Sequence, residues 1–355
     1  MINKEMKYTL NDVFIEPSVT SDIASRVECN PHHTDGMLPL FTAPMSSVID
    51  ENNYQRYIDN NINPILPRTV DLSTRLEKCT EVFCAFSLGE FEDIFINHPQ
   101  QFDVISGDTK LKVLVDIANG HMVKLHDLIV QSKERFGNRI IIMAGNVANP
   151  DTYTVLSNAG ADYVRVGIGS GSVCITSSNT SIHYSMASLI DECYSESLRL
   201  NKPAKIIADG GMNNFSDIIK SLALGADYVM CGNIFVKMLE SAAQTYGMVL
   251  DDITLTSNND PRLMEAFASG VKLTKVHYGM STKKAQKKLG KTKLNTSEGI
   301  EKRVDVEYTM ETWVDNFKSY LKSAMSYCSA RELTKFIGFP TLNVVSSNSY
   351  NVINK

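Results

Sequence analysis

The run from Gly167 to Thr176, GIGSGSVCIT, combines residue types that could do chemistry. Its three alternating glycines let a backbone turn sharply and bring N–H groups close to an anion. Cys174 follows them, and a cysteine beside a bound phosphate-bearing ligand would be placed to act as a nucleophile. A free cysteine is more often a buried packing residue, so this run by itself leaves both interpretations open.

A dinucleotide-binding turn of the Rossmann type is a weak interpretation of the same glycines. They do not open a long amphipathic helix, and no acidic residue follows about 20 residues later on a second strand. The elements around the run therefore have to decide its role.

Eight short apolar segments predict the strands that position this run. They cover residues 40–45, 63–68, 84–88, 112–118, 140–147, 163–169, 205–211 and 228–233. Most are rich in β-branched residues and apolar throughout, which is typical of strands buried on both faces of a parallel sheet. Helical patterns lie between them, for example at 151–160 and 215–225. This alternation favours an α/β fold of the (β/α)8 TIM barrel type, with a doubly wound open sheet as the alternative.

Polar and glycine-rich residues follow the ends of several predicted strands. They are Met45, Asp116, Asn119, Asn146, the Gly167 loop, Asp209–Gly211 and Gly232–Asn233. Active sites of (β/α)8 barrels lie at the carboxyl ends of the strands, so these residues should meet on one face. Their convergence is stronger evidence for a site than any single motif.

The composition of the chain excludes several classes of protein. The chain has 355 residues and a formal net charge of −5, which argues against a general nucleic-acid binder. It contains no run of about 18 apolar residues, and the start MINKEMKYTLND lacks the apolar stretch of a secretion signal. The seven cysteines are scattered, without CxxC spacing. We expect a cytoplasmic enzyme that does not contact a membrane.

Two segments fall outside the alternation of strands and helices. Residues 250–275 form a polar excursion without an assigned role, and residues 282–303 carry six lysines before Glu298. Such a run of charge is usually a solvated face. Its functional alternative is a mobile flap whose charge attracts a phosphorylated ligand. The last residues, SSNSYNVINK, are expected to be a frayed tail.

Several motifs together resemble those of the IMP dehydrogenase/GMP reductase family. They are LNDVFIEPS with a following Ser25-Arg26, PLFTAPMSSV, VDIANGH, AGNV, AGADYVRVGIGSGSVCIT, ADGG, HYGMS and SEGIEKRV, over roughly residues 8–340. The resemblance implies one (β/α)8 barrel catalytic domain at 1–340, with a mobile active-site flap at about 282–303 and no regulatory CBS insertion. Residues 341–355 would be a C-terminal tail.

The resemblance also implies that the barrel binds a purine nucleoside monophosphate, GMP or IMP. Cys174 would attack C2 of the purine, and Thr176 with Glu298 would protonate departing ammonia. The phosphate, ribose and base would be held by Met45, Ser172, Asp209, Gly211, Gly232, Asn233, Tyr278, Gly279, Met280 and Ser281. Within this set Asp209 would bond the ribose hydroxyls, because a carboxylate can accept from two adjacent OH groups.

A nicotinamide cofactor is implied by the same resemblance. Asp116, Asn146, Arg165 and Gly167 fall at the positions where the family places it. The cofactor would be NADPH in a reductase and NAD in a dehydrogenase. Carbonyls of Gly169, Gly171 and Cys174 would coordinate K⁺, as in some family members, and the assembly would be a homotetramer.

Three features favour the reductase branch. Only 42 residues lie between Arg68 and Leu111, too few for the pair of regulatory modules that dehydrogenases usually insert. No Arg-Tyr pair of the kind that activates water in the dehydrogenase flap occurs between Met280 and Val304. The wording MSTKKAQKKLG followed by SEG is similar to the reductase pattern. The alternatives are an IMP dehydrogenase without regulatory modules and a catalytically silent nucleotide-binding relative.

Overall fold

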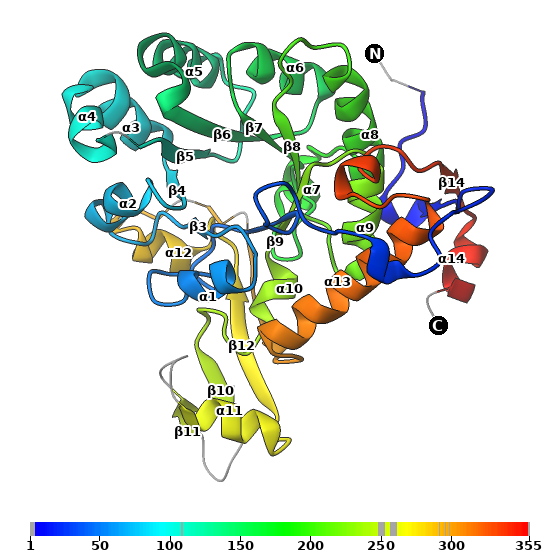
Figure 1. Cartoon of the computed structure of the whole chain (residues 1–355). Coiled ribbons are helices and arrows are strands. Elements are labelled where there is room, and N and C mark those ends of the chain that lie inside the picture. The colour runs from blue at the N-terminus through cyan, green and yellow to red at the C-terminus, as the bar shows by residue number, and fades with distance from the viewer. Residues whose placement is uncertain are drawn as a thin grey trace.

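Eight parallel strands form a barrel in the computed structural model, which describes residues 4–107, 109–247, 253–255, 261–290, 292–294, 296–297 and 299–353 (Figure 1). The strands are β2 (Leu40–Thr42), β3 (Ile65–Leu66), β4 (Phe83–Phe86), β5 (Leu111–Asp116), β6 (Ile140–Val147), β7 (Tyr163–Val166), β8 (Lys205–Asp209) and β9 (Tyr228–Cys231). Neighbours in the sheet follow the order β2-β9-β8-β7-β6-β5-β4-β3. All eight predicted strands are therefore present.

The two ends of this sheet meet beside Asn63. Its amide donates to the carbonyl of Leu40 at 3.0 Å, and its carbonyl accepts from Thr42 N at 3.0 Å. Phe41 and Asn63 form the corresponding parallel bridge. This closure confirms the (β/α)8 barrel over the open sheet.

Helices cover the outside of the barrel between successive strands (Figure 1). They are α1 (Tyr54–Asp59), α2 (Leu72–Lys78), α3 (Leu88–Phe91), a π-helical turn (Glu92–Asn97), α4 (Gln100–Ser106), α5 (Val123–Phe136), α6 (Pro150–Asn158), α8 (Met186–Ser197), α9 (Phe215–Ala223), α10 (Asn233–Val236) and α13 (Met310–Tyr327). Short 3-10 turns lie at Leu10–Asp12, Arg26–Glu28, Gly137–Arg139 and Leu333–Lys335.

The predicted helices at 151–160 and 215–225 correspond to α6 and α9. Each begins at an asparagine cap, since Asn149 accepts from Asp151 N and Asn214 accepts from Asp217 N. Each is followed by a glycine with positive φ, +101° at Gly160 and +110° at Gly225. These glycines end the helices and turn the chain into β7 and β9.

Aromatic side chains fill the amino-terminal half of the barrel interior. Phe41 packs edge-on against Phe83 with ring centroids 5.7 Å apart, and Phe83 packs against Tyr163 at 5.4 Å. Tyr228 closes the cluster against Phe41 at 5.0 Å. Phe83, Tyr163 and Tyr228 are the first residues of their strands, so they block that end. The carboxyl ends remain for a site.

A four-stranded antiparallel sheet accounts for much of the chain between β9 and α13. It comprises β10 (Thr245–Gly247), β11 (Ile253–Leu255), β12 (Leu273–Tyr278) and β13 (Glu301–Asp305), in the order β11-β10-β12-β13, with α11 (Pro261–Ala268) beside it. It projects away from the barrel at the bottom of Figure 1. The described part of the unassigned excursion 250–275 belongs to this sheet and α11, while the predicted flap contributes α12 (Lys283–Lys288) and β13.

The two terminal regions lie side by side (Figure 1). β1 (Val13–Ile15) pairs antiparallel with β14 (Leu342–Val344), and α14 (Ser347–Ile353) follows. Part of the segment expected to be a frayed tail thus has regular structure, since α14 lies within it, and β14 directly before it pairs with a strand far away in sequence; the domain boundary at 340 stays a prediction. Among the described residues, no helix has the length and apolar character needed to span a membrane.

Candidate active site

The cysteine loop leaves the carboxyl end of β7 and leads into α7 (Thr176–Thr180). Within it, Cys174 N donates to the carbonyl of Gly171 at 3.0 Å, which closes a tight turn. The Cys174 thiol donates to Thr176 Oγ1 at 3.2 Å and is half-buried. Cys174 also forms an antiparallel bridge with Gly299, and Ile300 N donates to the carbonyl of Val173 at 3.0 Å. The backbone at Cys174 therefore joins the loop to the flap segment.

Glycine is required where this loop crosses the neighbouring strand. Gly167 has φ +129°, and a Cβ there would overlap the carbonyl oxygen of Asp209. A Cβ on Gly210, whose φ is +96°, would lie 3.1 Å from Gly171 N. The loop thus rests directly on the ADGG segment, as expected of glycines that allow close backbone approach.

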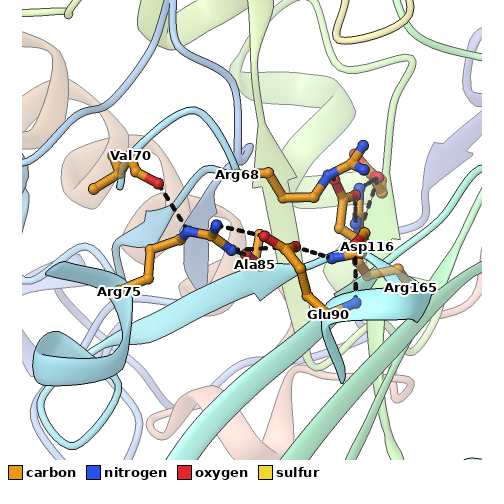
Figure 2. Close-up of polar contacts among 9 residues, drawn as sticks. Arg68, Val70, Arg75, Ala85, Glu90, Asp116 and Arg165 are labelled. Atoms are coloured by element: carbon orange, nitrogen blue, oxygen red, sulfur yellow. Dashed lines mark hydrogen bonds and ion pairs between the residues drawn. The ribbon is translucent and has the colours of Figure 1, made fainter. Parts of the chain in front are cut away.

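A buried ion network joins residues of four neighbouring segments at the centre of the site, and Figure 2 shows its members Arg68, Asp116 and Arg165. Arg165 Nη1 contacts Asp116 Oδ1 at 2.8 Å, and Arg165 Nη2 contacts Asp209 Oδ2 at 2.8 Å. Arg68 Nε donates to Asp116 Oδ2 at 3.0 Å. The Arg165 side chain is only 7% exposed, so its charge depends on these two carboxylates.

Asn146 connects the same network to the cysteine loop. Its Nδ2 donates to Asp209 Oδ2 at 2.7 Å and to the carbonyl of Gly167 at 2.8 Å. The structure therefore brings together the residues assigned to the cofactor, Asp116, Asn146, Arg165 and Gly167, and joins them to Asp209 on the substrate side. The described contacts of the Asp209 carboxylate all fall on Oδ2, which leaves Oδ1 for a ligand hydroxyl.

Charge pairing keeps Asp116 ionised in spite of its burial. Burial alone would raise the pKa of this carboxyl, but Arg68 and Arg165 overcome that effect and hold the pKa below its usual value. Burial opposes the charge on Arg165 as well, and the attraction of Asp209 and Asp116 raises the pKa of the guanidinium. The centre of the site is a set of fixed charges at neutral pH.

Arg75 supports the segment that carries Arg68. Its Nε donates to the carbonyl of Val70 at 2.8 Å, and its Nη1 donates to the carbonyl of Ala85 at 2.6 Å (Figure 2). Nη2 forms an ion pair with Glu90 at 2.7 Å. The turn after β3 is thereby fixed against the end of β4.

The residues assigned to substrate lie at two neighbouring places. Met45 meets Gly232, because a Cβ on Gly232 would lie 3.4 Å from Met45 Sδ. Tyr278 hydrogen-bonds through its hydroxyl to Ser46 Oγ at 2.9 Å, which joins the end of β12 to the loop after β2. In the next pair, His277 Nδ1 lies 3.0 Å from Ser47 Oγ. Burial lowers the pKa of His277 to about 4, so this ring is a neutral structural group.

The segment after Tyr278 returns across the cysteine loop. Gly279 is buried, and a Cβ there would lie 3.4 Å from the carbonyl of Val173. Ser281 Oγ would lie 3.0 Å from a Cβ on Gly299. Met280 is half-buried beside them, whereas Ser172 is exposed. These positions surround Cys174 with the segments expected to hold the nucleotide.

Two lysines of the charged run face Tyr278. Lys284 Nζ lies 4.8 Å from the centre of the tyrosine ring and Lys288 Nζ lies 5.7 Å from it. Lys284 also pairs with Glu301 at 3.6 Å. The start of the predicted flap therefore places positive charge beside a substrate residue.

For two of the predicted site residues the structure gives no supporting contact, and two residues of the site were not predicted from the sequence. Glu298 lies outside the described residues. The carbonyl of Gly171, expected at K⁺, accepts the Cys174 amide, though a carbonyl has a second lone pair. Arg68 and Ser46 were not predicted for the site. Arg68 could have been found, because it ends the predicted strand 63–68 and so belongs to the active-site face.

Comparisons with known proteins agree with this architecture. Residues 103–351 match the model of the IMP dehydrogenase / GMP reductase domain. An inosine-5'-monophosphate dehydrogenase of Chlorobaculum parvum is 32% identical over 247 residues, which are 68% of this chain and 48% of that protein. A GMP reductase of Chromobacterium violaceum is 31% identical over 251 residues, 68% of this chain and 75% of that protein.

The chain spans about half the length of the dehydrogenases that it matches, with 43% coverage of a second one from Chlorobaculum tepidum. Reductases and dehydrogenases both occur among its relatives, at similar identity. The family match covers β5 to β9, the cysteine loop and the antiparallel sheet. The chain belongs to the IMP dehydrogenase/GMP reductase family.

Proposed function

We propose that this protein is a GMP reductase, which converts GMP to IMP and ammonia with NADPH. The observation that carries the proposal is the position of the Cys174 thiol. The thiol lies 3.2 Å from the Thr176 hydroxyl. The backbone of Cys174 pairs with Gly299, the residue that follows Glu298 in the sequence. A nucleophile and a candidate proton-transfer hydroxyl are therefore in contact, and the segment of Gly299 adjoins them.

In this proposal the Cys174 thiolate attacks C2 of GMP, and the bond from C2 to the exocyclic nitrogen breaks. Nitrogen leaves as ammonia only when it is protonated, so the Thr176–Glu298 pair delivers a proton to it. A thioimidate then joins Cys174 to the purine. The cofactor, when bound, supplies a hydride for C2. Return of the electron pair of the C–S bond to sulfur restores the thiolate and releases IMP.

The cofactor-side residues fit a nicotinamide nucleotide. Arg165 pairs with Asp116, and Asn146 is joined to Arg165 through their shared partner Asp209. Asp116 keeps 12% of its side chain exposed. A fixed carboxylate of this kind suits the hydroxyls of a ribose. Arg68 would act as a positioning residue, since it holds Asp116 Oδ2 from the side of β3.

The connection between β3 and β5 favours the reductase over the dehydrogenase. The described chain runs from β3 through α2 to β4, then through α3 and α4 to β5, without an inserted domain. Two relatives identified as dehydrogenases support the alternative, an IMP dehydrogenase that makes XMP with NAD. K⁺ at the carbonyls of Gly169, Gly171 and Cys174, and assembly as a homotetramer, belong to the proposal as well.

Reduced-nicotinamide absorbance tests the proposal directly. The protein is mixed with GMP and NADPH and, in parallel, with IMP and NAD⁺. A fall in absorbance with GMP, accompanied by ammonia, is expected. A rise with IMP, accompanied by XMP, would establish the dehydrogenase instead.

Two cysteine variants test the covalent step. Cys174→Ala should abolish turnover and keep nucleotide affinity, because the thiol is needed only for bond formation. Cys328→Ala is the matched control, since Cys328 is also free and half-buried but lies after α13, away from the site. Turnover of Cys174→Ala within tenfold of the parent enzyme would contradict a thioimidate.

A further inference from the structure

Lys275 lies in β12, and its side chain is fully buried. Its Nζ donates to the carbonyl of Leu239, to the carbonyl of Ser241 and to the hydroxyl of Ser241, each at 2.8 Å. These three bonds use every N–H donor of an ammonium group. Among the described residues no carboxylate forms an ion pair with Lys275, so neutral oxygens hold its charge. A lysine buried in this way is costly, and its position calls for an explanation.

The turn that accepts these bonds, at residues 238–243, is attached to the loop after β2. Ala242 N donates to the carbonyl of Val48 at 3.0 Å, and Ala243 N donates to the carbonyl of Ser47 at 3.1 Å. β12 is therefore connected to the loop after β2 through the buried lysine and this turn.

The loop after β2 also contacts β12 directly. Ser47 Oγ lies 3.0 Å from His277 Nδ1, and Ser46 Oγ lies 2.9 Å from the Tyr278 hydroxyl. The strand, the turn and the loop thus form one closed cycle of hydrogen bonds. Both the strand and the loop adjoin residues assigned to the substrate, which are Met45 and residues 279–281.

We propose that Lys275 is a positioning residue for the nucleotide, because it attaches β12 to the barrel and so fixes Tyr278 and residues 279–281 against the loop after β2. The inference rests on the proposed nucleoside monophosphate substrate, which the buried lysine itself would not touch. Without its three bonds, β12 keeps its pairing with β10 and β13 but loses this attachment. The two sides of the nucleotide site then shift relative to each other, which weakens binding. Cys174 and Thr176 contact each other outside the cycle, so the chemical step changes less.

The titration of Lys275 gives this attachment a pH dependence. Burial lowers the pKa of the ammonium group to about 7; repulsion by Arg56 acts in the same direction, and attraction by Glu240 opposes it. The groups in register with it or on the same face of β12 are uncharged at neutral pH, and they are Thr245, Val304 and His277. Above its pKa the neutral amine has two N–H donors for three oxygens, so the attachment weakens as the pH rises through about 7.

Steady-state kinetics of Lys275→Met test this role, because methionine is similar in length, carries no charge and offers no N–H donor. We expect KM for GMP to rise about tenfold, while kcat stays within about threefold and KM for NADPH within about twofold. Lys220→Met is the matched control, since Lys220 is also buried and donates to the carbonyl of Leu10, but it belongs to α9 and lies outside the cycle. An equal rise of KM for GMP in both variants, or a fall in kcat without a rise in KM for GMP, would overturn the inference.

The pH dependence of GMP binding is a second measurement, made by calorimetry in the Cys174→Ala background so that ionisation of the thiol does not contribute. The dissociation constant for GMP should rise about threefold between about pH 6.5 and about pH 8.5. Adding Lys275→Met should remove this rise, whereas adding Lys220→Met should leave it in place. A flat profile with Lys275 present would overturn the inference, and this result does not require that Lys275→Met folds.

The outcomes separate this inference from the proposed function. An unchanged KM for GMP in Lys275→Met, with a parent protein that turns over GMP, would overturn the role of Lys275 alone. A rise of KM for IMP in Lys275→Met, with a parent protein that oxidises IMP, would support that role and refute the reductase. A parent protein that binds neither nucleotide would overturn both proposals.

Discussion

Removal of the Arg165 guanidinium, for example in Arg165→Gln, should unbalance the centre of the site. The side chain is 7% exposed and is the shared partner of Asp116 and Asp209. Removing one partner of a buried ion pair typically costs about 3–5 kcal/mol, because a charge is left buried without compensation. Asp116 keeps Arg68, and Asp209 keeps Asn146. We therefore expect the lower end, about 3 kcal/mol, or roughly two powers of ten in the folding equilibrium.

Urea unfolding at about pH 8 measures this loss, with Arg139→Gln as the control. Arg139 pairs with Asp103 at 2.7 Å, but its side chain is 49% exposed. Exposed pairs contribute about 0–1 kcal/mol, so the control should be close to the parent protein. Equal destabilisation by the two substitutions would refute the role of Arg165 as the shared ion-pair partner in a buried network.

The pH dependence of the Arg165→Gln deficit gives a second test. In the parent protein the two arginines hold the pKa of Asp116 below its usual value against the effect of burial. Without Arg165, burial favours the protonated carboxyl, and a folded state that binds the proton more tightly gains stability as the pH falls. The difference in unfolding free energy between the parent protein and Arg165→Gln should therefore become smaller as the pH falls from about 8 to about 5. A deficit that is constant over this range would contradict the electrostatic explanation.

Three further substitutions have defined outcomes. In the parent protein, His277 should cost up to about 3 kcal/mol of stability as the pH falls from about 6.5 to about 4, because its folded-state pKa lies below the unfolded one. His277→Gln should remove this pH-dependent loss, and unfolding measured over the acid range checks it. Gly167→Ala should cost at least about 2 kcal/mol in thermal unfolding, since its Cβ would overlap the carbonyl of Asp209, while Gly36→Ala, with open space around it, costs about 1 kcal/mol. Thr176→Val should slow ammonia release in single-turnover traces by about 100-fold or more, with recovery in Thr176→Ser.

The eight strands and the glycine–cysteine loop could be predicted from the sequence because their signals are local. Apolar β-branched runs bounded by glycines specify buried parallel strands whatever their partners are. Several strands, however, end earlier than predicted. Residues 43–45, 117–118 and 167–169 leave the sheet, since their backbones turn to build the site instead of continuing the ladder.

The antiparallel sheet was not predicted, because its strands are short and their pairing is non-local. β10 pairs with both β11 and β12, and β12 pairs with β13 across the charged run. The composition of residues 250–275 does not indicate which strands pair with one another. The ordered strand β14 has the same origin, since its partner β1 lies at the other end of the chain.

The family, the barrel and the nucleophilic loop could be predicted from the sequence, because each depends on patterns that are local to short segments, even where several segments are combined. The pairing of the charged residues, in contrast, follows from the three-dimensional fold. Asp116 and Asp209 end β5 and β8, Arg165 lies in β7, and Arg68 follows β3. The arrangement of these strands around the barrel brings the four side chains within hydrogen-bond distance. The fold also leaves the Ser170 hydroxyl buried beside the turn at Gly210, without a hydrogen-bond partner among the described residues. Such contacts depend on which strands become neighbours, and no local pattern encodes that.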